Sequence, residues 1–217
     1  WMPSARLVNL NDDELPDIAY LNVGDDLQGK LNIHFQSAAG GFSESPDWQG
    51  VIETRGDIRL VDLNGDKQLD LIRTDGNGNE WTSYFFVNSN GSFDLDQANQ
   101  VMRFSGYDAD LNFIDINDDG RPSLNVSYYT VPVVNAIRNT SIVRTQLLYS
   151  GSSVTEGLFS RRPDSRLEES FSASDVRGLA EQMSLRFDID GDGSKDAMYI
   201  TTEGTLAAKR NDETLQI

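Results

Sequence analysis

The sequence predicts an all-β protein built from four repeated units, each of about four short strands. A nine-residue acidic stretch with constant apolar flanks occurs four times, beginning at residues 9, 62, 115 and 188. Between these copies, short runs rich in β-branched and aromatic residues alternate with Gly, Asn and Asp turn signals, which is typical of strands. The first three copies are 53 residues apart and the fourth follows after 73, and a period of about 50 residues indicates a repeat architecture.

The fourth acidic stretch, from Asp188 to Asp196, reads Asp-Ile-Asp-Gly-Asp-Gly-Ser-Lys-Asp. Carboxylates at its first, third, fifth and ninth positions are spaced to converge on one point, together with the backbone carbonyl of the seventh residue. Gly191 and Gly193 can supply the backbone angles that such a tight loop needs. Ca2+ takes about six to eight oxygen ligands at flexible geometry, whereas Mg2+ demands a stricter shell. The pattern therefore predicts a calcium loop.

The other three copies keep this frame with small changes. The stretch from Asp62 to Asp70 keeps every ligand position, with an amide at the third. The stretch from Asn9 to Asp17 has amides at the first and third positions, and the stretch from Asp115 to Ser123 ends in a serine. One such run arises easily by chance in an acidic chain, but four copies with matching apolar flanks are a strong signal.

Each unit is expected to contribute a series of short strands. In the first two units we expect strands at Ala5–Leu10, Asp17–Val23, Gly29–Gln36, a weak one within Phe42–Thr54, then Asp57–Leu63, Asp70–Arg73, Trp81–Asn88 and roughly Ser92–Phe104. The run from Tyr84 to Val87 is apolar on both faces, as in a strand covered by neighbouring sheets.

The third and fourth units are less regular. We expect strands at Asp110–Ile116, Ser123–Val131 and Ser141–Tyr149, then a long polar stretch to Arg177, then strands at Ser184–Ile189, Asp196–Thr202 and Thr205–Arg210. The last unit is expected to lack about one strand, unless the tail Thr214–Ile217 supplies it. Units of four short strands that cannot bury their own faces stack as propeller blades. We therefore predict one β-propeller-type domain over 1–217, with units at about 3–55, 56–108, 109–182 and 183–217.

The loops, together with the turns Gly41-Phe42 and Gly91-Ser92-Phe93, resemble FG-GAP/VCBS repeats, the calcium-loop blades of integrin-like β-propellers, over nearly the whole chain. The resemblance implies a calcium loop between the first two strands of each blade, and up to four Ca2+ ions. It implies these metal ligands: Asn9, Asn11, Asp13, the Leu15 carbonyl and Asp17; Asp62, Asn64, Asp66, the Gln68 carbonyl and Asp70; Asp115, Asn117, Asp119, the Arg121 carbonyl and Ser123; Asp188, Asp190, Asp192, the Ser194 carbonyl and Asp196. The family usually closes about seven blades, so four blades imply either a compact arrangement or part of a longer propeller.

The charge balance restricts the partners. With 35 acidic and 18 basic residues the formal net charge is −17, which four bound Ca2+ ions would bring to −9. No basic stripe exists to neutralise phosphates, so we expect no nucleic-acid partner, and no stretch is long enough to insert in a membrane. There is no cysteine. Calcium loops of this kind fill where Ca2+ is millimolar, which indicates an extracellular or cell-surface location, with the periplasm as an alternative.

Two other interpretations of the motifs are weaker. An EF-hand-type loop needs a carboxylate at position twelve and flanking helices, whereas position twelve here is Tyr20, Arg73, Val126 and Tyr199. His34 is the only histidine, and it lies in an expected strand. The chain has no nucleophile-elbow sequence and no phosphate-binding glycine loop. We therefore expect no catalytic residues and no organic cofactor.

The function expected from the sequence is a non-catalytic, calcium-stabilised, secreted or cell-surface module for protein or carbohydrate binding and adhesion. The alternatives are the propeller portion of a lyase-like, polysaccharide-active enzyme and a scaffold section of a large bacterial toxin or adhesin. The lack of an acid/base pair outside the loops favours the first. A sugar-stacking platform is also conceivable, although aromatic strand residues are usually core; its members would be Trp48, Trp81, Tyr84, Tyr128 and Tyr129. The chain begins Trp1-Met2-Pro3, without an initiating Met, so we expect its start to be trimmed. We also expect the chain to be part of a larger polypeptide.

Overall fold

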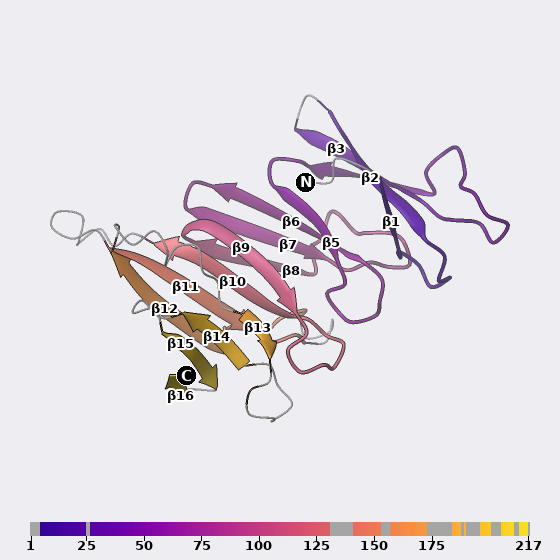
Figure 1. Cartoon of the computed structure of the whole chain (residues 1–217). Coiled ribbons are helices and arrows are strands. Elements are labelled where there is room, and N and C mark those ends of the chain that lie inside the picture. Colours follow the sequence, from indigo (N-terminus) through magenta and orange to yellow (C-terminus); the bar gives the residue numbers. More distant parts are fainter. Residues whose placement is uncertain are drawn as a thin grey trace. The chain divides into compact units, whose positions relative to one another are not determined.

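The computed structural model describes residues 5–24, 27–130, 141–152, 157–172, 184–187, 189, 196–200, 205–210 and 213–216. Within these residues every regular element is a β-strand, and the strands form four-stranded sheets, each built from four consecutive strands (Figure 1). All described strand pairs are antiparallel. No helix among the described residues is long and apolar enough to cross a membrane. The prediction of an all-β chain of four-stranded units is therefore confirmed.

The first two sheets follow one another along the chain. Sheet one contains β1 (Arg6–Val8), β2 (Asp17–Val23), β3 (Gln28–His34) and β4 (Trp48–Glu53), in that order. Sheet two contains β5 (Asp57–Val61), β6 (Asp70–Asn77), β7 (Glu80–Phe86) and β8 (Gln100–Ser105), in that order. In each sheet the expected calcium loop joins the first strand to the second.

The other two sheets have the same order. Sheet three contains β9 (Tyr107–Ile114), β10 (Ser123–Thr130), β11 (Ser141–Tyr149) and β12 (Ser165–Ser172). Sheet four contains β13 (Ser184–Phe187), β14 (Asp196–Ile200), β15 (Leu206–Arg210) and β16 (Glu213–Gln216). The chain divides into two compact units: Trp1–Phe104 with Ser153–Leu158, and Ser105–Ser152 with Phe159–Ile217.

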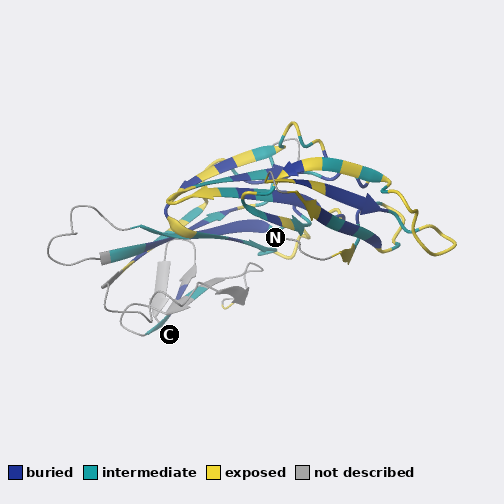
Figure 2. Ribbon diagram, turned by 90° about the horizontal axis from the view of Figure 1, so that it is seen from above, coloured by how far each residue is buried: buried dark blue, intermediate teal, exposed yellow. Residues whose placement is uncertain are grey.

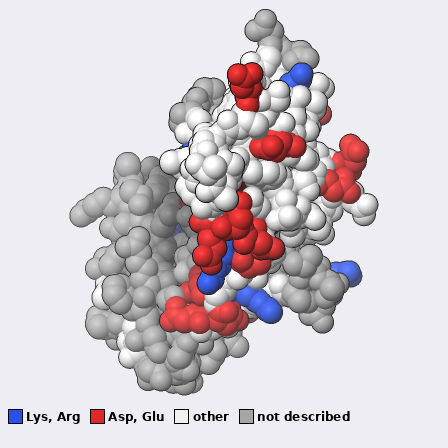
Figure 3. All heavy atoms as spheres, turned by 90° about the vertical axis from the view of Figure 1, so that its right-hand side faces the viewer, with Lys and Arg blue, Asp and Glu red and all other residues white. Residues whose placement is uncertain are grey.

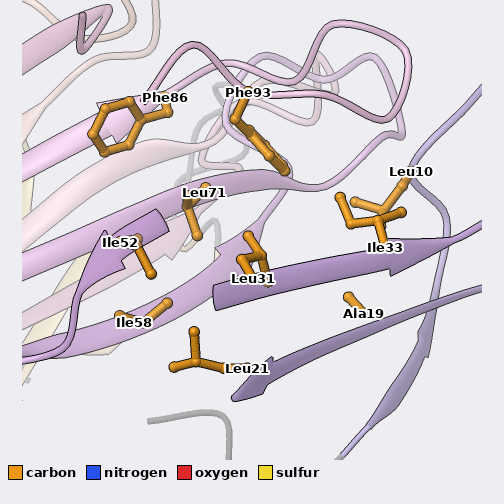
Figure 4. Close-up of a cluster of buried hydrophobic side chains, with 10 residues drawn as sticks. All are labelled: Leu10, Ala19, Leu21, Leu31, Ile33, Ile52, Ile58, Leu71, Phe86 and Phe93. Carbon is orange, nitrogen blue, oxygen red and sulfur yellow. The ribbon is translucent and has the colours of Figure 1, made fainter. Parts of the chain in front are cut away.

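In the first unit one apolar cluster joins sheets one and two. Figure 2 shows bands of buried and more exposed residues along the strands. Burial alternates in this way along β2 and β4, because successive side chains of a strand point to opposite faces. The buried face of sheet one meets apolar residues of sheet two, as Figure 4 shows. The cluster consists of Leu10, Ala19, Leu21, Leu31, Ile33, Ile52, Ile58, Leu71, Phe86 and Phe93. Neither sheet could bury these side chains alone, so the two sheets stabilise each other.

Three strand predictions need correction or completion, and one burial prediction is confirmed. β6 does not end at Arg73 but continues to Asn77, because Gly76 lies under the Trp81 ring and Gly78 turns the hairpin at φ 67°. The polar stretch after Tyr149 contains β12, which periodicity alone did not indicate. The tail does supply a fourth strand to the last sheet, β16. Phe85 and Phe86 are both buried, as expected for an apolar run covered on two faces.

Sheet three has one apolar and one polar face. Leu111, Val126 and Leu147 lie on the apolar face in register across β9, β10 and β11. On the opposite face Arg144 is buried and donates from Nε and Nη2 to Oε2 of Glu169, at 2.9 and 2.5 Å. A buried ion pair of this kind is costly to break, because one charge would remain uncompensated.

Candidate metal loops

The three described loops share one backbone feature. Position six adopts a left-handed conformation in each, at φ 60°, 71° and 81° for Glu14, Lys67 and Gly120. Such angles are unfavourable for residues other than glycine, so the two non-glycine residues are held there by the loop. The flanks of all three loops are strands, which removes the EF-hand interpretation for these copies.

Positions three, five and seven form the same hydrogen-bonded frame in each loop. The amide nitrogen of the third residue donates to one carboxylate oxygen of the fifth, and the backbone N–H of the seventh donates to the other oxygen. The amide contacts are Asn11–Asp13 at 3.1 Å, Asn64–Asp66 at 2.8 Å and Asn117–Asp119 at 2.9 Å. The backbone contacts are Leu15–Asp13 at 2.9 Å, Gln68–Asp66 at 2.8 Å and Arg121–Asp119 at 2.8 Å.

Position one differs between the loops. The Asp62 carboxylate accepts the N–H groups of Asn64, Gly65 and Lys67 at 3.2, 2.7 and 2.9 Å. The Asp115 carboxylate likewise accepts two N–H groups, from Asp119 and Gly120, at 3.2 and 2.9 Å. These contacts fold each loop around its first carboxylate.

In the first loop Asn9 occupies position one. Its Nδ2 donates to the Lys67 carbonyl at 3.1 Å, whereas its Oδ1 is buried and has no hydrogen-bond partner among the described residues. A buried, unpaired amide oxygen costs free energy unless a partner arrives. This oxygen is an expected metal ligand, and a cation would satisfy it.

Position nine lies deeper than the other ligand positions. The Asp17 carboxylate accepts the N–H groups of Leu10 and Gln36 at 3.1 and 3.2 Å. The Asp70 carboxylate accepts the equivalent N–H groups of Leu63 and Asn88 at 2.7 and 2.8 Å. Both aspartates are fully buried, so each ties its loop to the end of a later strand. Ser123 has no carboxylate to make these contacts.

Burial also shifts the pKa of both ninth-position carboxyl groups. It raises the pKa of Asp70 to about 7, with further elevation by Asp66 and Asp62 and opposition from the two backbone N–H donors. Burial raises the pKa of Asp17 for the same reason, with Asp13 adding to the effect. A cation in either loop would offset this repulsion and favour the ionised carboxylates.

The donor set of each described loop suits a hard cation. Among the described residues, no three His, Cys, Asp or Glu side chains lie close enough together to hold a metal ion. The oxygens of positions one, three and five and the carbonyl of position seven would hold Ca2+, which accepts amide, carbonyl and carboxylate oxygens alike. The amide at position three now presents its nitrogen to position five, so it must turn its oxygen inward on binding.

The first and second loops are bonded to each other. Leu69 N–H donates to the Asn9 carbonyl at 3.0 Å, and Gln68 Nε2 donates to Asp12 Oδ1 at 2.7 Å. The buried Asn88 amide donates to the carbonyls of Leu10 and Leu69 at 2.9 and 3.1 Å. These hydrogen bonds therefore hold the first and second loops against each other.

The fourth loop lies almost entirely outside the described residues. Of its nine positions only Ile189, which is exposed, and the backbone of Asp196 at the start of β14 are described. The predicted ligands Asp188, Asp190, Asp192 and Ser194 therefore remain predictions, as does the ligand role of Asp196.

The remaining candidate residues pack into the sheets. His34 is buried, its ring stacks on Tyr20, and its Nδ1 lies 3.0 Å from the Ser43 carbonyl. Because a carbonyl only accepts, Nδ1 carries the proton in this contact. Trp48 and Tyr84 pack against the apolar cluster of the first unit, as aromatic strand residues usually do.

The sequence analysis did not identify a second repeated contact, which lies at the start of β4, β8 and β12, the fourth strands of the first three sheets. Asp47, Asn99 and Asp164 each make two hydrogen bonds at the end of the third strand. The side chain accepts a backbone N–H, and the residue's own backbone N–H donates to the carbonyl of the residue two positions before that donor. The acceptor contacts are Phe35–Asp47 at 2.7 Å, Val87–Asn99 at 2.7 Å and Ser150–Asp164 at 2.6 Å. The reciprocal backbone bonds reach the carbonyls of Ile33, Phe85 and Leu148. Two copies carry a shared pattern, Ser43-x-x-Pro-Asp47 and Ser160-x-x-Pro-Asp164, which could have located β12.

No family model and no curated protein matches this chain.

Proposed function

We propose that this chain is a non-catalytic, calcium-stabilised β-propeller module of the FG-GAP/VCBS type that binds a protein or carbohydrate outside the cytosol. Up to four Ca2+ ions would occupy the loops and fix the angle between the first two strands of each blade. The four-stranded sheets would be the blades.

The observation that carries the proposal is the recurrence of one loop architecture in three places. Each described loop combines a left-handed position six with a position-five carboxylate bonded to positions three and seven. All the oxygens that would reach the cation come from one short segment, so the ion would mainly fold that segment. A cation bound in the first loop would satisfy the buried Oδ1 of Asn9, which has no hydrogen-bond partner among the described residues.

Surface charge is consistent with this assignment. Acidic groups gather on the face drawn in Figure 3, with few lysines and arginines between them. Bound Ca2+ would reduce this repulsion, and the described residues on this face offer phosphate-bearing partners little positive surface. The proposed partners are therefore proteins or glycans.

Chelation tests the proposal directly. A ligand that binds only the folded state stabilises it by about 2.7 kcal/mol per site at a hundredfold excess over its Kd. Excess EGTA should therefore lower the melting temperature by several degrees, and added Ca2+ should restore it. Mg2+ at the same concentration should not restore it. A melting temperature that is unchanged by EGTA would refute the calcium assignment.

A further inference from the structure

A cavity of about 180 Å³ opens beside the third loop. It is lined by five positions of that loop, Ile116, Asn117, Asp119, Arg121 and Ser123, and by Ser150 and Gly151, which directly follow β11. Ile116 is the second position of the loop. All these residues belong to one compact unit, so the cavity is a feature of that unit alone.

The other two described loops fill the corresponding place with a carboxylate. Asp17 and Asp70 occupy position nine, and each accepts the N–H of position two and the N–H of one residue beyond the third strand. In the third loop position nine is Ser123, whose side chain is shorter and uncharged. The space that an aspartate would take is left to the cavity.

Gly151 is the counterpart of Gln36 and Asn88. Phe35, Val87 and Ser150 donate their backbone N–H groups to the side chain that precedes the fourth strand. Gln36, Asn88 and Gly151 are the residues that directly follow them. Gly151 also lies against the loop, because a Cβ there would come within 2.7 Å of the Pro122 carbonyl oxygen. In the first two loops two residues donate their backbone N–H groups to the position-nine carboxylate, and their counterparts in the third loop, Ile116 and Gly151, both line the cavity.

We propose that this cavity binds a carboxylate group of an external ligand, which takes the place of the missing ninth-position aspartate. The inference rests on the proposed calcium loops, because Asp115 and Asp119 would repel an anion unless a cation lay between them and it. With Ca2+ present, the carboxylate would contact the ion and the N–H groups of Ile116 and Gly151. Arg121 and the hydroxyl groups of Ser123 and Ser150 supply further donors around the cavity. The third loop would then be a ligand site, whereas the first and second loops, closed by their own aspartates, would be structural.

The experiment uses acetate as the probe and acetamide, its uncharged isostere, as the control. Amide chemical shifts of the full 217-residue chain are followed in 1H–15N NMR spectra with saturating Ca2+ and again with EGTA. Acetate should shift the Ile116 and Gly151 amides saturably only in Ca2+, and acetamide should not. If the chain takes up no Ca2+, the proposed calcium function fails. If the chain binds Ca2+ but acetate does not shift these two amide signals, the proposed carboxylate site is refuted while the calcium proposal stands.

Ser123→Asp supplies the missing carboxylate within the chain. It should weaken acetate binding at least tenfold, because the new side chain fills the cavity, and it should tighten Ca2+ binding at the third loop. Ser105→Asp adds the same charge at an exposed position of the same unit and should change neither. Retention of acetate binding by Ser123→Asp would overturn the proposal. If that variant fails to fold, the comparison of acetate with acetamide on the unmodified chain still decides.

Discussion

Replacement of Asn88 by alanine tests the bonding between the first two loops. The Asn88 side chain makes three hydrogen bonds within a buried site: two donated to the Leu10 and Leu69 carbonyls at 2.9 and 3.1 Å, and one accepted from Gly91 N–H at 2.7 Å. Each such bond contributes about 1 kcal/mol net. Asn88→Ala should therefore lower the free energy of unfolding by about 3 kcal/mol. In a chain of this size that corresponds to a fall in melting temperature of about 6–12 °C.

Tryptophan fluorescence is a suitable assay, because Trp48 and Trp81 both lie in the strands of sheets one and two. The melts are recorded in saturating Ca2+, so that loop occupancy does not differ between variants. Asn79→Ala, in the exposed turn between β6 and β7, is the matched control and should change the free energy by less than about 0.5 kcal/mol. A melting temperature for Asn88→Ala within about 2 °C of the parent protein would refute the claim that these bonds hold the loops together.

Three further predictions follow from particular residues. Gly91 and Gly40 have nearly the same φ, 83° and 81°, but a Cβ at Gly91 would lie 2.2 Å from the Phe35 ring, whereas a Cβ at Gly40 meets nothing within 4 Å. Gly91→Ala should therefore lower the melting temperature clearly more than Gly40→Ala. Equal effects of the two substitutions would contradict the packing of Gly91 against Phe35. Asp164→Ala removes the acceptor for Ser150 N–H, so hydrogen exchange of that amide should accelerate at least tenfold, and an unchanged rate would show that the contact is not formed. Affinity follows the number of loop carboxylates, so calcium titrations should lose the tightest phase in Asp192→Asn and only the weakest in Asp119→Asn, with Asp66→Asn and Asp13→Asn between; loss of the tightest phase in Asp119→Asn would contradict the ligand assignment.

The strand pattern and the loop positions were predictable because both depend on local sequence. The spacing from Asp62 to Asp70 and its apolar flanks placed a loop between two strands, where the structure has β5 and β6. β12 was missed because its sequence, Ser165 to Ser172, is polar and lacks clear alternation. The local signal that does mark its start, a Ser-x-x-Pro-Asp turn, becomes visible only when compared with the copy that ends at Asp47.

The hydrogen bonds of the carboxylates at position nine could not be predicted from the sequence, because their donors come from distant segments. Asp70 accepts the N–H of Asn88, 18 residues further along the chain. The links between loops are more distant still, since Asn88 reaches the carbonyl of Leu10 across 78 positions. The spacing of residues within a loop indicates which side-chain oxygens can approach one ion. The tertiary contacts determine which of these oxygens also accept backbone N–H groups.

A calcium-anomalous difference map tests whether the loops bind Ca2+. In crystals grown with millimolar Ca2+, we expect an anomalous peak in the second loop, about 2.3–2.6 Å from side-chain oxygens of Asp62, Asn64 and Asp66 and from the Gln68 carbonyl. We expect further peaks at the equivalent positions of the other loops, and an Asn64 amide turned with its oxygen toward the ion. A well-ordered second loop with no peak, and with Asn64 Nδ2 still donating to Asp66, would show that this loop is not a calcium site.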